Sequence, residues 1–335
     1  MVKKVSVLLL MVLLLVVSPL LGCSNSSVVV TDPIKFVPNK ANLVGLIDIT
    51  GILQDKNLTG IYDTIPKDTS YPQSFYDALS KLKDEYNIDL MGFQEGLFFA
   101  EVSGSEDQGN YSGVIVEGTY NKSDLIAAIQ SAAGTELSTI KYKDYEIHTD
   151  ELQESAIAFL SDNMLVIGAI EPVKDVIDVK KGDAKALGGE VLDSYNKLGD
   201  ALIKVAVAVP PNVTEGELGE SASQYLGDLS AFDKVESVGM TVSKNDGAIT
   251  IDLKLCCVDS DSAQSIEQTI NGLITFAQFL TGMSENQQQN QALDTLLNKI
   301  KVTRSDTCVS INITATLTEI EDLIQSASQG SGQSG

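Results

Sequence analysis

Histidine often acts as a catalytic acid or base, and arginine often binds phosphate groups. This chain has one of each, His148 and Arg304. A hydrolase of the Ser-His-Asp type would need His148 as its general base, yet no serine lies in a G-x-S-x-G turn. The same scarcity excludes a zinc site built from histidines, and the His-Glu-x-x-His motif is absent. We interpret His148 as a surface residue at a strand end, beside Glu146 and Asp150.

Carboxylates are the abundant reactive groups, because 46 Asp and Glu residues stand against 23 Lys and Arg residues and give a formal net charge of −23. A carboxylate-based hydrolase therefore stays among the hypotheses. Sugar-cleaving sites usually have aromatic platforms, however, and the chain has no tryptophan. The acidic charge is spread over many short segments, which argues against a nucleic-acid partner and favours solubility and repulsion from an anionic surface. Cation buffering is a weaker alternative.

The segment Asp259-Ser260-Asp261-Ser262-Ala263-Gln264 has the spacing of the first positions of a calcium loop. Its fifth and sixth positions lack the oxygen ligand and the glycine that such a loop needs. We interpret the segment as the cap of a long helix, whose positive N-terminal end favours acidic residues. The sequence predicts no metal ion and no other cofactor.

Three cysteines, Cys256, Cys257 and Cys308, allow one disulfide and one leftover thiol. Residues alternate between the two faces of a strand, so Cys257 lies on the apolar face of the strand at 248–258 and Cys256 on the polar face. Cys308 lies on the polar face of the strand at 307–317. A vicinal bond would strain the peptide, and a zinc site would lack a fourth ligand. The pattern predicts a Cys256–Cys308 disulfide, provided that the two strands are neighbours, and a buried Cys257 thiol.

The N-terminus has the plan of a secretory signal peptide: Lys3 and Lys4, an apolar run over 7–17, a break at Ser18-Pro19 and the small residue Gly22. The stretch Leu20-Leu21-Gly22-Cys23 resembles the lipobox of the bacterial lipoprotein family.

This resemblance implies cleavage after Gly22, a diacylglyceryl group on Cys23 and a further acyl chain on the new amino group. It places the protein on the cell membrane, anchored by lipid and facing outside the cytoplasm, with the choice between inner and outer membrane left open. The alternative is an uncleaved transmembrane helix, but an apolar run of 11 residues is much shorter than the roughly 20 that cross a bilayer.

Hydrophobic periodicity and turn residues divide the rest of the chain into short strands and helices. Strands are expected at 42–49, 96–102, 111–120, 139–142, 145–149, 155–160, 164–168, 201–209, 235–243, 248–258, 299–304 and 307–317. Helices are expected at 75–86, 123–133, 172–179, 190–198, 263–280, 293–297 and 318–326.

The order of elements after residue 201 repeats the order after residue 42, as though the chain were built twice. The pattern predicts an α+β fold of two tandem copies of an antiparallel-sheet unit, with helices packed on one face. We expect a signal peptide at 1–22, a tether at 23–39, a first repeat at 40–190, a second at 191–326 and a disordered tail at 327–335. The segment Phe159–Asp183 resembles duplicated α+β extracytoplasmic proteins of unknown function among bacterial lipoproteins, which implies a fold and no activity.

Three functional hypotheses follow. The leading one is a membrane-anchored lipoprotein with a non-enzymatic structural or interaction role, whose membrane contact is the lipid on Cys23 and whose protein or small-ligand partner is unknown. The second is a lipoprotein that binds a small or apolar ligand between helix and sheet, suggested by the apolar stripes at 125–133 and 263–280, although such stripes usually form ordinary core. The third is the carboxylate-based hydrolase.

Overall fold

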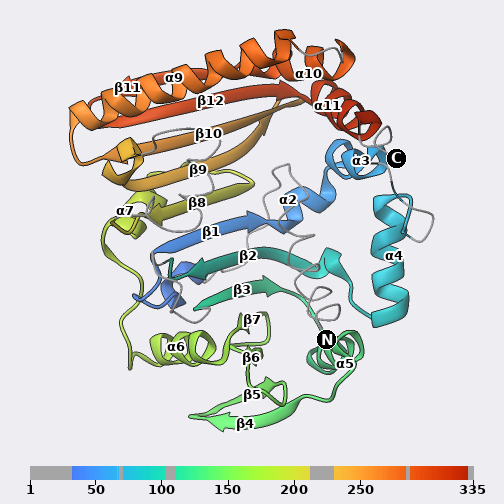
Figure 1. Ribbon diagram of the computed structural model, residues 1–335. Coiled ribbons are helices and arrows are strands. Elements are labelled where there is room, and N and C mark those ends of the chain that lie inside the picture. The colour runs from blue at the N-terminus through green and yellow to red at the C-terminus, as the bar shows by residue number, and fades with distance from the viewer. Residues whose placement is uncertain are drawn as a thin grey trace. The chain divides into compact units, whose positions relative to one another are not determined.

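The computed structural model describes residues 32–65, 67, 71–102, 111–211, 230–283 and 287–330. The segment predicted to be a signal peptide, the predicted lipidation site Cys23 and residues 331–335 lie outside this part of the chain. The fold divides into two compact units, and the second consists of residues 190–335 together with the short segments 64–66 and 102–108. Figure 1 shows the elements of both in chain order.

The first unit contains a sheet whose neighbouring strands all pair antiparallel, in the order β1-β2-β3-β7-β6-β5-β4. The strands are β1 (Leu43–Asp48), β2 (Phe93–Ala100), β3 (Ser112–Gly118), β4 (Ser138–Tyr142), β5 (Tyr145–Thr149), β6 (Ala156–Phe159) and β7 (Met164–Gly168). The accompanying helices are the 3-10 turns η1 (Pro33–Phe36) and η2 (Leu90–Gly92), and α2 (Ile49–Gln54), α3 (Lys56–Thr64), α4 (Phe75–Tyr86), α5 (Lys122–Ala133) and α6 (Ile170–Lys181).

Local sequence sets the ends of these helices. The Ser74 hydroxyl caps α4 by accepting a hydrogen bond from the Asp77 amide. The helices α5 and α6 end at Gly134 and Gly182, which have positive φ values of 67° and 80°. A residue without a Cβ adopts this left-handed conformation without a steric penalty, so glycine ends both helices.

Part of the core of the first unit lies against β7. On one side, Leu125 of α5 packs against Ile157 and Leu165. Val166, which follows Leu165 in β7, is also buried, although consecutive side chains of a strand point to opposite faces. Both faces of β7 are therefore covered, which explains why its sequence is continuously apolar instead of alternating.

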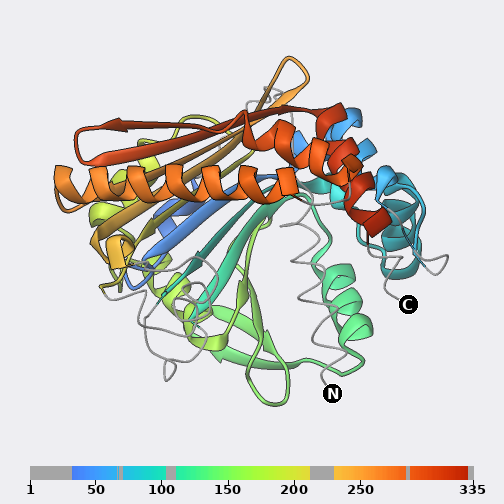
Figure 2. The same ribbon diagram turned by 45° about the horizontal axis from the view of Figure 1, so that its top comes forward.

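The second unit contains a five-stranded antiparallel sheet in the order β8-β9-β10-β12-β11. Its elements are α7 (Gly189–Asn196), β8 (Ile203–Ala208), η4 (Ser230–Lys234), β9 (Val235–Asn245), β10 (Ala248–Cys257), α9 (Ser260–Met283), α10 (Gln287–Leu297), β11 (Lys301–Ser305), β12 (Cys308–Thr316) and α11 (Leu317–Gly330). Figure 2 shows the long helix α9, in orange, running across the strands of this sheet. No helix in the described ranges is both long and apolar enough to cross a membrane.

The two sheets share a strand order. In each sheet, the first three strands of the unit lie side by side. The last strand of the unit pairs with the third, and the strand before the last lies next to it. The two orders are β1-β2-β3-β7-β6 and β8-β9-β10-β12-β11. A helix, α5 or α9, follows the third strand in both, and another, α6 or α11, follows the last. The predicted α+β class with antiparallel sheets and packed helices is confirmed. The superposition of residues 40–190 on residues 200–326 as two copies of one unit stays a prediction.

Two expectations at the chain ends were wrong. Residues 33–39 were assigned to the tether, but Ile34 and Val37 are buried and Pro38 forms a β-bridge with Ala186. This segment has no periodicity and is held by buried side chains together with backbone hydrogen bonds to Lys185 and Leu187. At the other end, the disordered tail was expected from residue 327, but α11 continues to Gly330.

A further error concerns the segment after β1. The sequence predicts no helix between the strand at 42–49 and the helix at 75–86, whereas the structure has the helices α2 and α3 there. The Asp48 carboxylate caps α2 by accepting a hydrogen bond from the Gly51 amide at 2.8 Å. Asp48 is also the last residue of β1, so the helix begins without any intervening turn residues, and the strand pattern hid its start.

A substitution at Gly168 tests the close packing of β3 and β7. A Cβ at this position would lie 2.5 Å from the Ser112 carbonyl oxygen and 2.8 Å from the Gly113 Cα, both backbone atoms that cannot move aside alone. We expect Gly168→Ala to lower the free energy of unfolding by about 1–3 kcal/mol, measured by urea denaturation. The matched control is Gly60→Ala in α3, where a Cβ meets nothing within 4 Å. It should raise stability by about 0.5–1 kcal/mol, and equal effects of the two variants would contradict this packing.

Candidate functional site

A disulfide joins the neighbouring strands β10 and β12 of the second unit. Cys256 of β10 and Cys308 of β12 lie directly opposite each other, with a Cα–Cα distance of 4.1 Å and their Sγ atoms bonded. This is the pair that the strand pattern predicts, and the neighbouring position of the two strands, which the sequence could not prove, is confirmed. The bond spans 52 residues that include α9, α10 and β11.

The face that carries the disulfide is polar. Along it, the Asn312 side-chain amide donates to the Asp252 carboxylate at 2.6 Å, and the Thr250 and Thr314 hydroxyls lie 3.0 Å apart. Both cysteines of the bond are half-buried. Since the opposite face holds the apolar residues, the alternation of β10 keeps the covalent bond and the hydrophobic core on different sides of the sheet.

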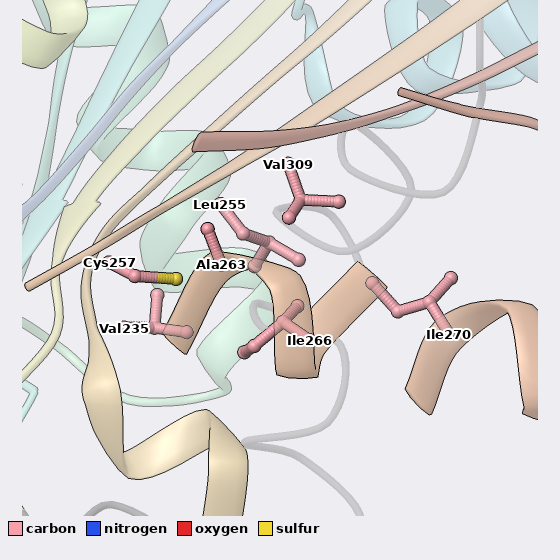
Figure 3. Packing of buried hydrophobic residues seen from close by; sticks show 7 residues of the cluster. All are labelled: Val235, Leu255, Cys257, Ala263, Ile266, Ile270 and Val309. Carbon is pink, nitrogen blue, oxygen red and sulfur yellow. The ribbon is translucent and has the colours of Figure 1, made fainter. Parts of the chain in front are cut away.

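Cys257 lies on the core side, one residue from the disulfide. Its side chain is 3% exposed and packs in a cluster of buried residues from β9, β10, α9 and β12. Figure 3 shows the members of this cluster: Val235, Leu255, Cys257, Ala263, Ile266, Ile270 and Val309. Burial raises the pKa of the Cys257 thiol, with the carboxylates of Asp259 and Glu236 acting in the same direction. The thiol therefore stays protonated and is a poor nucleophile.

The acidic segment before α9 forms a helix cap. The Asp259 carboxylate accepts a hydrogen bond from the Ser262 amide at 2.7 Å, and this bond lowers the pKa of Asp259. The interpretation of the segment as a cap is confirmed. Within the described ranges, no group of three or more His, Cys, Asp or Glu residues has the geometry to hold a metal ion.

The single arginine and the single histidine both make structural contacts. The Arg304 Nε donates to the Glu267 carboxylate at 3.0 Å, which ties β11 to α9. His148 lies one residue from the end of β5, with its Nδ1 3.1 Å from the Thr139 hydroxyl and its ring edge-on to Phe159. The sequence indicated the position of His148, whereas nothing in it indicated which helix Arg304 would contact.

Burial along α9 changes from its first half to its second. Ala263, Ile266 and Ile270 are buried in the core cluster. Farther along the helix, Leu273 and Ile274 are only half-buried, and Phe276 and Phe279 are 54% and 60% exposed. Two exposed aromatic rings three residues apart lie on neighbouring positions of a helix surface, so the second half of α9 presents apolar area to solvent.

Removal of the disulfide tests its place in the fold. In the chain-entropy model a bond that closes 52 residues contributes roughly 4 kcal/mol, so Cys256→Ser with Cys308→Ser should lower the free energy of unfolding by up to about that amount. The control Cys257→Ala should keep the bond in non-reducing peptide mapping. A map of the wild type that joined Cys257 to Cys308, or found all three thiols free in protein isolated without reductant, would contradict the assignment.

Comparison with known proteins shows a fold relationship and no family. No family model and no curated protein matches the chain. Among solved structures, crystal form III of TP0453 is similar over 89% of this chain and 99% of that chain, with a TM-score of 0.50 and 8% sequence identity. Crystal form I of TP0453 has a TM-score of 0.46 and 9% identity over 89% of this chain and 98% of that chain. Identity this low shows a similar fold alone, which is the mixed α+β architecture described above.

Proposed function

We propose that this chain is a lipid-anchored lipoprotein that faces outside the cytoplasm and has a non-enzymatic structural or interaction role. The proposal is carried by the short stretch of chain that separates the lipobox cysteine, Cys23, from the first described residue of the fold. Cys23 precedes Asp32, the first described residue, by nine positions. A fully extended chain gains at most about 3.6 Å per residue, so the first unit is held within roughly 32 Å of the acylated cysteine.

The disulfide supports the same location. Disulfides form and persist in oxidising compartments and are rare in the cytosol. A Cys256–Cys308 bond between facing residues of paired strands fits a chain that is exported before it folds. The formal net charge of −23 agrees with this location, because an acidic protein is repelled by an anionic membrane surface while its lipid anchor holds it at that membrane.

A non-enzymatic role rests on what the reactive side chains do in the fold. His148 contacts Thr139 and Phe159, Arg304 pairs with Glu267, and Cys257 is a protonated thiol in the core. Each of these groups has a packing or pairing role, and the described residues contain no cluster with metal-binding geometry. The contacts of His148, Arg304 and Cys257 do not favour the hypothesis of a carboxylate-based hydrolase.

The anchor is tested by replacing the acylated residue. We expect Cys23→Ala to abolish incorporation of a labelled fatty acid and to leave the signal peptide uncleaved, because both steps need the thiol of that residue. The measurement is metabolic labelling followed by electrophoresis of the membrane fraction, with Cys257→Ala as the matched control that should label like the wild type. Labelling of the Cys23→Ala protein at the wild-type level would show that another residue carries the lipid.

A second candidate function is the binding of an apolar ligand, and the exposed second half of α9 is the observation that favours it. Apolar side chains that are half-buried or exposed there, including Leu273, Ile274 and Phe276, leave area for a further contact. The closed cluster around Ile266 argues that any such ligand would lie along the second half of the helix only.

Substitution of the exposed rings tests this candidate. Phe276→Ser with Phe279→Ser should weaken the binding of a fluorescent apolar probe about tenfold, because roughly 1.4 kcal/mol of apolar contact would be lost. Gln264→Ser with Gln268→Ser, at exposed polar positions of the same helix, should leave probe binding unchanged. If both double variants bound the probe equally, the second half of α9 would not be the binding surface.

A further inference from the structure

Three carboxylic acids lie in a row across the first three strands of the first unit. Asp48 of β1 is directly opposite Glu95 of β2, and Glu95 is directly opposite Glu117 of β3. Residues that face each other in antiparallel strands place their side chains on the same face, with Cβ atoms about 4.5–5.5 Å apart. We call Asp48, Glu95 and Glu117 the carboxylate row.

Like charges at this spacing repel, and the effect grows where water is excluded. The burial of the row is greatest at its β3 end: Glu117 is 2% exposed, while Asp48 and Glu95 are half-buried. The Glu117 Oε2 atom is buried and finds no hydrogen-bond donor in the described part of the chain. A buried charged oxygen without a partner costs several kcal/mol in general, whereas the protonated form of the acid avoids most of that cost.

The other oxygen of Glu117 connects the row to a turn. Its Oε1 accepts a hydrogen bond from the Asn163 side-chain amide at 3.0 Å. The Asn163 backbone oxygen in turn accepts from the Gly118 amide at 2.9 Å, and its side-chain oxygen accepts from the Ser161 hydroxyl at 2.8 Å. These bonds hold the turn between β6 and β7 against the end of β3.

The residues directly opposite Glu117 in its two strand pairs, within the described part of the chain, carry no positive charge. From β2 it faces Glu95, and beyond that Asp48 of β1, both acidic. From β7 it faces Met164. In the adjoining turn Asp162 is exposed and pairs with Lys122 at 2.8 Å, so that lysine is already engaged. Burial raises the pKa of Glu117 and that of Asp48, although for Asp48 the bond from the Gly51 amide acts against the increase.

We propose that the carboxylate row is a proton-operated latch: a protonated Glu117 keeps the end of β3 closed against the Ser161–Asn163 turn, and its ionisation loosens this end of the sheet. A rise in pH removes the proton and leaves a negative charge on a buried carboxyl whose Oε2 atom has no hydrogen-bond donor among the described residues. Acidification restores the proton and closes the latch. The unfolded chain ionises in the ordinary glutamate range near 4.3, so the contribution of the latch to stability is complete below that range and disappears as pH rises through the higher folded-state value.

Hydrogen exchange on the full chain tests the latch. Between pH 5 and pH 8, after correction for the intrinsic exchange rate, the opening of segments 112–118 and 161–168 should increase at least tenfold in the wild type. Glu117→Gln has the same shape and cannot ionise, so its opening should change less than twofold over that range. Glu146→Gln, an exposed position on β5 of the same unit, should behave as the wild type.

A second measurement does not depend on the folding of any variant. Carboxyl-carbon NMR of the wild type should show the Glu117 resonance titrating above the ordinary glutamate range, because burial raises the pKa of this carboxyl. The proposal would be overturned by a Glu117 midpoint in the ordinary range. Wild-type pH dependence of opening in Glu117→Gln would overturn it as well.

Discussion

Antiparallel strand register is the constraint on which both notable sites of this protein depend. In the second unit, the register of β10 with β12 brings Cys256 opposite Cys308. In the first unit, the register of β1, β2 and β3 brings three carboxylates into one row. A shift of one residue in either sheet would turn these side chains to the other face, because side chains alternate along a strand. The sites exist only while hydrophobic burial holds the register.

Hydrophobic burial against α9 fixes the register in the second unit. Leu255 and Cys257 of β10 and Val309 of β12 pack under Ala263 and Ile266 of the helix. A slipped strand would bring Cys256, Lys254 or Ser310 to this apolar cluster and expose the buried residues. The covalent bond on the polar face and the packing on the apolar face thus stabilise the same register from two sides of one strand pair.

Much of this architecture could be predicted from the sequence, because alternation and turn chemistry are local signals. The alternation of apolar and polar residues along β10 indicated its two faces, and with them the partner of Cys256. The helices α2 and α3 were missed because Asp48 ends a strand and caps a helix at once. The carboxylate row was missed for another reason: Asp48, Glu95 and Glu117 are far apart in the chain, and only the pairing of β1 with β2 and of β2 with β3 brings them together. Local patterns predict faces, whereas long-range register determines neighbours.

We propose that this fold stands outside the cytoplasm on a lipid anchor, with one disulfide and one buried thiol. The most direct test is the intact mass of the protein extracted from membranes without reductant. The account predicts the mass of residues 23–335 with a diacylglyceryl group and a further acyl chain, less two hydrogens for the disulfide, and a single alkylatable thiol after unfolding. A mass equal to the complete unprocessed chain, or three alkylatable thiols among Cys256, Cys257 and Cys308, would contradict it.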